Sequence, residues 1–212
     1  MDKIKILRPS KDEYYLDLAK TVAKRGTCTK VEFGAVIIKD DQVVATGYNG
    51  APRGAKSSIE HGFCLRKQLG IPSGRNYEIC RSVHAEQNAI INAARAGVSL
   101  LGGDIYIHGE LREDGKKGKP VDAFPCFICK KMLINCGLKR VICSLANGNY
   151  KVFYINEWIR EWCESDIIDD QFQYGVEYLE PGATEKRKYF KVSPVLAKKI
   201  EHVKKTKVKS RR

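Results

Sequence analysis

The sequence predicts an α/β layered fold built around one core. Short runs rich in Val, Ile and Tyr, which are typical of strands, alternate with segments whose apolar residues recur at helical spacing. Such alternation is the pattern of α/β domains. A chain of 212 residues can bury one sizeable core and is short for two. No internal repeat is visible in the sequence, so we expect one domain with appendages.

The first part of the chain predicts a helix, a hairpin and a long loop. Apolar residues at helical spacing predict a helix over residues 12–24. Two strand-like runs follow at residues 33–39 and 42–48, and the two aspartates between them predict a tight turn. Residues 49–81 are rich in Gly, Pro, Ser and charge. We therefore expect a long ordered loop there without regular elements.

The second part alternates helices and strands. A helix is predicted over residues 83–96, with Gly97 as its stop signal, and a strand over residues 104–109. Residues 110–123 are polar and rich in Gly and Lys, which predicts an exposed insertion, and a flexible surface loop is its simplest interpretation. The remaining predicted elements are a helix at 126–136 that Pro125 opens, a strand at 140–145, a helix at 156–165 and a strand at 174–180.

The net charge of +13 is concentrated at one end of the chain. Residues 186–212 hold 12 Lys and Arg against one acid, so residues 1–185 carry only +2. We therefore divide the chain into a domain at residues 10–182 and a lysine-rich tail at residues 183–212. Three interpretations of the tail stay open: a solvated basic end, a short docking helix, or a nucleic-acid-binding or nuclear-targeting segment.

The sequence also indicates a compartment. Its opening residues contain no apolar signal-peptide core, and no apolar run approaches the roughly 18 residues of a membrane span. We therefore expect an intracellular, cytoplasmic protein that makes no membrane contact. In a reducing compartment the eight cysteines are expected as metal ligands, catalytic groups or buried apolar residues, and not as disulfides.

Two short motifs carry the chemistry. The stretch SVHAEQNAII places His84 and Glu86 two residues apart at a predicted helix start, and PCFIC supplies Cys126 and Cys129 at C-x-x-C spacing. Residues three apart share one face of a helix, so both thiols can reach one metal. Two thiolates and one imidazole leave a tetrahedral zinc with one open position for water, which is the catalytic arrangement. This combination of H-x-E and P-C-x-x-C is the signature of the zinc nucleobase deaminases.

Glu86 is the predicted proton carrier of such a site. Zinc lowers the pKa of bound water from about 15.7 toward about 7. A neighbouring carboxylate can then pass the water proton to N3 of a pyrimidine while the oxygen attacks C4. A group that takes up and releases protons cannot itself be tied to the metal. A redox pair, or half of a structural zinc ribbon, is the alternative for the C-x-x-C alone.

The sequence resembles the deoxycytidylate (dCMP) deaminase family over about residues 10–180. The matching segments are RGTCTK (25–30), FGAVIIKDD (33–41), ATGYNGAPRG (45–54), CRSVHAEQNAIINAA (80–94) and PCFICKKMLINCGLKRVI (125–142). The resemblance implies a cytidine deaminase-like, three-layer α/β/α fold with a mixed sheet of about five strands. It also implies bound zinc, a homo-oligomer, and conversion of dCMP to dUMP as a precursor of thymidylate.

The resemblance implies further site residues. Asn49 resembles the asparagine that holds the nucleotide sugar in related deaminases, with a turn residue at unusual backbone angles as the alternative. Arg25 is a predicted 5′-phosphate contact, because a guanidinium binds phosphate bidentately, and Ala85 is a predicted substrate contact. Several family members use the same region for dCTP activation and dTTP inhibition. The candidate effector loop here is Gly47, Tyr48, Asn49 and Gly50.

Further cysteines leave a second metal open. Some family members hold a structural zinc in loops that are comparable to the region before the catalytic motif. The alternative is that these residues are ordinary free cysteines near the core. The candidate ligands are Cys28, His61, Cys64 and Cys80.

Three functions are compatible with the motifs. The first is a zinc-dependent dCMP deaminase that acts on free nucleotide. The second is a deaminase of polynucleotide, such as tRNA adenosine or DNA cytosine, with the basic tail gathering substrate. The third is a catalytically silent deoxynucleotide-binding protein. The nearly neutral body of the chain disfavours the second function, and the intact proton carrier Glu86 disfavours the third.

Overall fold

The structure, a computed structural model, describes residues 8–71, 76–113 and 116–164. Residues up to Ile159 form one compact unit and residues from Arg160 onward a second, and the first unit contains the sheet. Its helical segments are α1 (Lys11–Ala23), α2 (Ser58–His61), α3 (Leu65–Gln68), the 3₁₀ turn η1 (Tyr77–Ile79), α4 (Ala85–Arg95), α5 (Phe127–Asn135) and the beginning of α6 (Ile155–Glu164). Its strands are β1 (Val31–Lys39), β2 (Gln42–Tyr48), β3 (Asp104–Glu113), β4 (Lys116–Pro120), β5 (Arg140–Ser144) and β6 (Tyr150–Tyr154).

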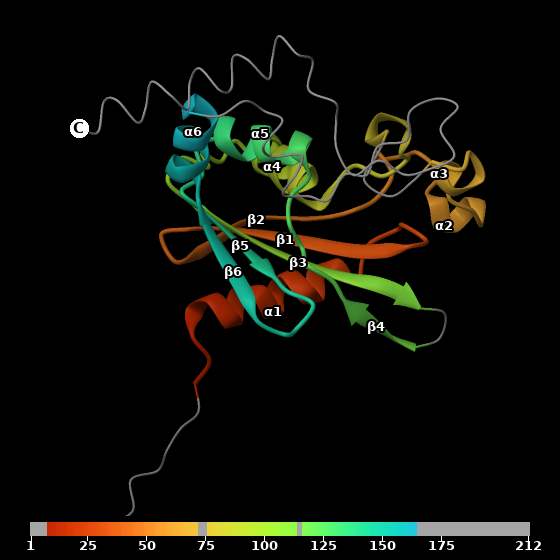
Figure 1. Cartoon of the computed structure of the whole chain (residues 1–212), viewed down its shortest axis with the longest axis horizontal. Helices are drawn as coiled ribbons and strands as arrows, with labels where there is room; N and C mark the ends of the chain where they lie inside the picture. The colour runs from red at the N-terminus through yellow and green to blue at the C-terminus, as the bar shows by residue number, and fades with distance from the viewer. Residues whose placement is uncertain (1–7, 72–75, 114–115, 165–212) are drawn as a thin grey trace, which may run out of the picture. The chain divides into compact units, whose positions relative to one another are not determined.

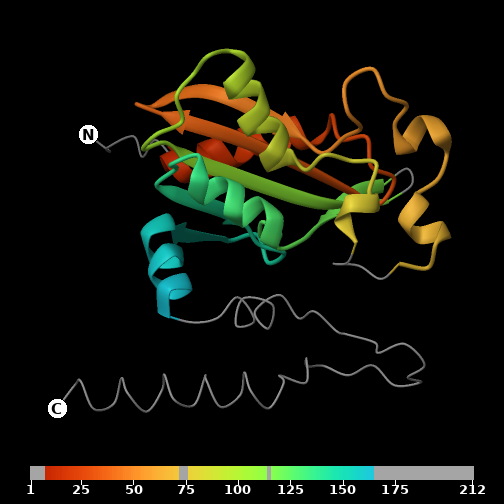
Figure 2. The same cartoon turned by 90° about the horizontal axis from the view of Figure 1, so that it is seen from above.

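The described strands form one mixed sheet between two layers of helices (Figure 1). The strand order is β2-β1-β3-β5-β6, and β4 pairs with β3 beside this path. β3 and β5 are parallel and the other pairs are antiparallel. Helix α1 covers one face, whereas α4 and α5 lie side by side on the other (Figure 2). The predicted three-layer α/β fold is confirmed, with six described strands in place of about five.

The hairpin between β1 and β2 follows directly from its two turn residues. Asp40 and Asp41 have φ angles of 50° and 62°, the left-handed conformation that a two-residue hairpin turn requires. Asp41 also accepts a hydrogen bond of 2.7 Å from the Tyr15 hydroxyl of α1. The turn therefore fixes both the register of the hairpin and its attachment to α1.

The core has two halves, one on each face of the sheet. On β1, Val36 and Ile38 pack with α1, whereas Ala35 and Ile37 pack with α4 and α5. A strand that is covered on both faces has no polar side, and residues 34–38 are accordingly all buried. Of the helices that the structure describes, none has the length and apolar character needed to span a membrane.

Glycines allow both helix layers to approach the sheet closely. A Cβ atom on Gly34 would meet the backbone of α1 at Ala19 and Ala23, and one on Gly47 would meet the backbone of α4. Because neither neighbour is the flexible end of a side chain, a Cβ atom would force strand and helix apart.

Three segments differ from the sequence prediction. The loop expected at residues 49–81 contains α2, α3 and η1, which are too short for a periodic pattern to reveal. The insertion expected at residues 110–123 is largely a β-hairpin, because β3 continues to Glu113 and pairs with β4. Strand β6 was not predicted at all. The predicted strand at residues 174–180 and the tail at 183–212 lie outside the described residues, so the proposed domain division stays a prediction.

The close contact at Gly47 provides a stability test. Gly47→Ala should lower the free energy of unfolding by about 2 kcal/mol, because the added methyl group overpacks the junction of β2 and α4. The matched control is Thr46→Ala at the exposed neighbouring position, which should change this free energy by less than about 0.5 kcal/mol. Urea denaturation of both variants measures the difference. Equal stability of the two variants would contradict the packing described.

Candidate metal centre and the pocket beside it

Two helix starts bring the motif residues together. His84 is the N-cap residue of α4 and Cys126 is that of α5, and both have extended backbone angles. Each side chain is therefore located at the N-terminal end of its helix. Cys129 lies one turn into α5, and Glu86 lies in the first turn of α4. The side-chain oxygen of Gln87 accepts a 3.0 Å hydrogen bond from the His84 backbone N–H and so fixes this entry.

The three predicted ligands form a compact cluster. The Nδ1 atom of His84 lies 3.4 Å from the sulfur of Cys126 and 3.4 Å from that of Cys129. The three ligand atoms all lie within 4.8 Å of one another. A tetrahedral zinc, bound at about 2.3 Å from sulfur and 2.0–2.1 Å from nitrogen, holds such atoms roughly 3.6 Å apart. The donor set and its spacing therefore fit zinc.

The cluster is also prepared for a cation electrostatically. The Cys129 thiol donates a hydrogen bond to Cys126. This bond lowers the pKa of Cys126 to about 4 and raises the pKa of Cys129. Of the two thiols, Cys126 therefore gives up its proton first. A metal ion that replaces the proton of Cys129 gains two thiolate ligands beside a ring nitrogen.

Glu86 lies beside the cluster without belonging to it. Its side chain is deeply buried, with the residue 4% exposed. Burial raises the pKa of its carboxyl, since a buried carboxylate loses the solvation of its charge. Glu86 lines the same pocket as His84 and Cys126. A buried carboxyl with a raised pKa, next to a metal centre, has the properties of a group that takes up and returns a proton.

The pocket next to the cluster has a volume of about 380 Å³. The Tyr77 ring packs edge-on against the His84 ring, with 4.9 Å between centroids, and the Arg66 guanidinium lies 4.8 Å from the centroid of Tyr77. Lys30 and Arg66 bring positive charge to its lining, Glu86 and Asp122 are its acidic side chains, and the other lining residues are mainly apolar and aromatic. The apolar and aromatic side chains include Val31, Phe33, Leu111, Val121 and Phe124.

Comparison with known proteins identifies the family. Residues 9–145 match the model of the cytidine and deoxycytidylate deaminase zinc-binding region. The chain belongs to this family. Within the described residues, His84, Cys126 and Cys129 are the cluster that could hold its zinc.

Several relatives carry the name deoxycytidylate deaminase. One from Schizosaccharomyces pombe is 34% identical over 135 residues, which are 64% of this chain and 37% of that protein. One from Mycobacterium phage D29 is 34% identical over 140 residues, which are 64% of this chain and 94% of that protein. The chain therefore spans little more than a third of the yeast relative. Among solved structures, dCMP deaminase from cyanophage S-TIM5 has 24% sequence identity to this chain and a TM-score of 0.44. The match covers 64% of this chain and 82% of that chain.

The three predicted substrate contacts of this deaminase-family chain occupy different positions. Asn49 lines the pocket, and its side chain joins β1, because Oδ1 accepts from the Phe33 N–H and Nδ2 donates to the Val31 carbonyl, both at 2.9 Å. The alternative of unusual backbone angles is wrong, since Asn49 does not have a positive φ. Ala85 is buried and lines the pocket. Arg25 is exposed and is not among the lining residues.

The structure does not gather the candidate second zinc site. Three of the four proposed ligands, Cys28, Cys64 and Cys80, line the pocket, but His61 does not. Within the described part of the chain, His84, Cys126 and Cys129 are the only group of three or more ligand side chains close enough for one metal. The three cysteines form no disulfide, and the four residues do not form such a group among the described residues.

The candidate effector loop has structural contacts of its own. Gly47 packs against α4, and Gly50 forms a pair of backbone hydrogen bonds with Val83 just before the metal motif. Tyr48 is partly exposed. These contacts connect the loop to the start of α4, and its role in binding an effector stays a prediction.

Sequence reasoning did not select Lys30, Arg66 or Tyr77. Lys30 lies inside the RGTCTK segment, so the resemblance could have pointed to it. Arg66 and Tyr77 lie in the region read as an irregular loop, where no periodic pattern indicates which side chains face the site.

Metal content tests the ligand assignment. Cys129→Ser should reduce bound zinc from about one ion per chain to well below that, because a neutral hydroxyl is a far poorer zinc ligand than a thiolate. The matched control is Cys163→Ser, at an exposed cysteine, which should retain the metal. Elemental analysis of both purified variants is the measurement. Full zinc content in Cys129→Ser would show that this sulfur is not a ligand.

Proposed function

We propose that this chain catalyses the hydrolytic deamination of dCMP to dUMP with release of ammonia. The observation that carries the proposal is the buried Glu86 carboxyl beside a three-ligand zinc site, in one shared pocket. The volume of about 380 Å³ lies within the range of small-molecule sites. The relatives named deoxycytidylate deaminase support the choice of substrate.

The residues present can carry out the proton transfers. His84, Cys126 and Cys129 would hold the zinc, which when bound activates water for attack at neutral pH. Glu86 accepts a proton from the water that attacks C4 and delivers it to N3. The second water proton then reaches the 4-amino group through Glu86, the C4–N bond breaks, and ammonia leaves as the C4 carbonyl forms. Glu86 returns to its starting state, and a buried position keeps this proton from bulk solvent.

The pocket lining supports a role for two cations in phosphate recognition. Lys30 and Arg66 line the pocket, whereas the predicted contact Arg25 does not. A guanidinium binds phosphate bidentately, and an ammonium adds a point charge. We propose that Arg66 and Lys30 bind the 5′-phosphate of the nucleotide. Asn49 binds the sugar, as the resemblance implies.

The same proposal includes the setting of the enzyme. All eight cysteines are free, which is consistent with a reducing, cytoplasmic compartment. A homo-oligomer and regulation by dCTP and dTTP stay predictions that rest on the resemblance.

A substrate panel tests the function. Purified, zinc-loaded protein is supplied with dCMP, CMP, deoxycytidine or a cytosine-containing oligonucleotide, and ammonia release is measured. We expect a clear preference for dCMP. Activity on the oligonucleotide alone would support the polynucleotide deaminase instead, and binding of nucleotide without ammonia would support the silent binding protein.

Glu86→Gln separates catalysis from metal binding. We expect kcat for dCMP to fall by about 10²–10⁴-fold, because the amide cannot accept and return a proton. Zinc content should stay at the wild-type level, since Glu86 is not one of the clustered ligands. Steady-state kinetics and elemental analysis of the same preparation provide both numbers. Turnover close to wild type would exclude Glu86 as the proton carrier.

Arg66→Gln tests the phosphate assignment. Its kcat/KM for dCMP should fall about tenfold or more, because a hydrogen bond to a charged group is lost, while that for deoxycytidine changes less than about twofold. The comparison variant is Arg25→Gln, which should leave the ratio between the two substrates unchanged. If kcat/KM for dCMP fell selectively in Arg25→Gln and not in Arg66→Gln, Arg25 and not Arg66 would be the phosphate contact.

A further inference from the structure

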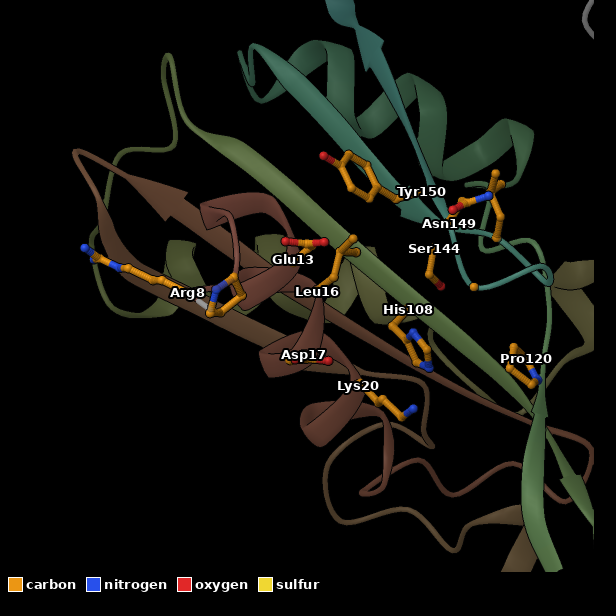
Figure 3. Close-up of a pocket in the computed structure, with 13 residues that line it drawn as sticks. Arg8, Glu13, Leu16, Asp17, Lys20, His108, Pro120, Ser144, Asn149 and Tyr150 are labelled. Atoms are coloured by element: carbon orange, nitrogen blue, oxygen red, sulfur yellow. The ribbon is translucent and has the colours of Figure 1, made fainter. Parts of the chain in front are cut away.

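A second, larger groove lies on the face of the sheet that α1 covers (Figure 3). Its volume is about 680 Å³. Helix α1 forms one wall with Leu16 and Lys20, β3 and β5 form the floor, and Tyr150 at the start of β6 forms the opposite wall. The groove shares none of its lining residues with the pocket at the metal centre.

Two buried polar side chains form the floor. Ile107 of β3 pairs with Cys143 of β5, so the next residues, His108 and Ser144, are neighbours on adjacent parallel strands. Both are 7% exposed, and Figure 3 shows both side chains directed into the groove. The Ser144 hydroxyl is buried and has no hydrogen-bond partner within the described part of the chain. An unpaired buried hydroxyl is costly, and a ligand in the groove would supply its missing partner.

The hydrogen bonds of His108 determine what it offers to a ligand. Its Nε2 lies 3.0 Å from Glu110 Oε1, and Lys20 pairs with the same carboxylate oxygen at 3.3 Å. Burial lowers the pKa of His108, which keeps the ring neutral at pH 7. A neutral ring that donates from Nε2 to Glu110 has an acceptor lone pair at Nδ1. The floor therefore presents one acceptor, on His108, and one hydroxyl, on Ser144, side by side.

The charge of the groove argues against a multiply charged anion. Its lining carries two basic side chains, Arg8 and Lys20, and two acidic ones, Glu13 and Asp17. Lys20 is further neutralised by Glu110. A phosphate group would therefore find no net positive charge, whereas an uncharged polar molecule meets no electrostatic penalty.

We propose that this groove binds an uncharged planar heterocycle of the nucleobase or nucleoside class. Its hydrogen-bonding edge would face His108 and Ser144, because adjacent donors and acceptors are typical of nucleobase edges. Its flat face would lie against the Tyr150 ring, since bases stack on aromatic side chains. The volume of the groove accommodates a ligand of this size.

Hydrogen exchange measured by mass spectrometry locates the ligand directly. The full-length chain is incubated with thymidine, deoxyuridine or adenosine, and amide exchange is compared with and without ligand. We expect slower exchange at residues 144–150, because 144, 145 and 148–150 line the groove. Binding in the pocket at the metal centre would instead slow exchange at residues 82–86. The two sites are thus resolved in one experiment, independently of any deaminase activity.

Matched variants test the named contacts. Ser144→Ala and Tyr150→Ala should each weaken binding of the nucleoside by about tenfold, since a hydrogen bond or a stacking contact is lost. The nucleoside to test is the one that protects residues 144–150. The control is Tyr154→Ala, at an exposed tyrosine on the same strand outside the groove, which should bind normally. Ser144→Ala should also fold with wild-type stability, because its hydroxyl makes no hydrogen bond to the described residues.

Three results would overturn the proposal. The first is unchanged exchange at residues 144–150 with all three nucleosides. The second is protection that survives both Ser144→Ala and Tyr150→Ala. The third is stronger protection of residues 144–150 by the 5′-monophosphates than by the nucleosides, which would assign an anion to the groove and contradict the ligand class.

Discussion

The position of the metal centre depends on the close contact between β2 and α4. Gly47 lies directly against the backbone of α4 at Ala85 and Ala89, and both alanines are completely buried. β2 is an edge strand, and two asparagines of α4 donate side-chain hydrogen bonds of 2.7 Å to its carbonyl groups at Tyr48 and Thr46. These contacts fix where α4 begins. They therefore also fix the directions of His84 and Glu86 at that helix start.

The charge of the site explains why a cation belongs there. The buried Glu86 carboxyl and the Cys126 thiolate lie in one pocket. Both groups favour the protonated form of His84. One imidazole would not compensate two thiolates beside a buried carboxyl. A divalent ion at the ligand cluster neutralises the thiolates and leaves Glu86 free to exchange a proton. Metal binding and proton exchange need different groups, which explains why the carboxylate is not one of the ligands.

Sequence patterns predicted those parts that depend on local periodicity or short motifs. The helix starts near His84 and Cys126 followed from apolar spacing and from Pro125, and the hairpin turn followed from two adjacent aspartates. The pocket cations could not be found in this way. Arg66 reaches the site from the short helix α3, which has too few residues to show a periodic pattern in the sequence. Strand β4 was missed for a related reason: its Lys- and Gly-rich sequence has low strand propensity, and pairing with β3 overrides that preference.

The two pockets lie on opposite faces of the sheet but depend on the same short segments. Cys143 and Ser144 are consecutive on β5, and alternation directs Cys143 toward the core beneath Glu86 and Ser144 into the groove. The Ser144 carbonyl accepts a 2.9 Å hydrogen bond from the Ala123 N–H, between Asp122 and Phe124 of the metal-site pocket. The backbone of β5 therefore contributes to the floor of the groove on one face and supports the segment that lines the pocket on the other.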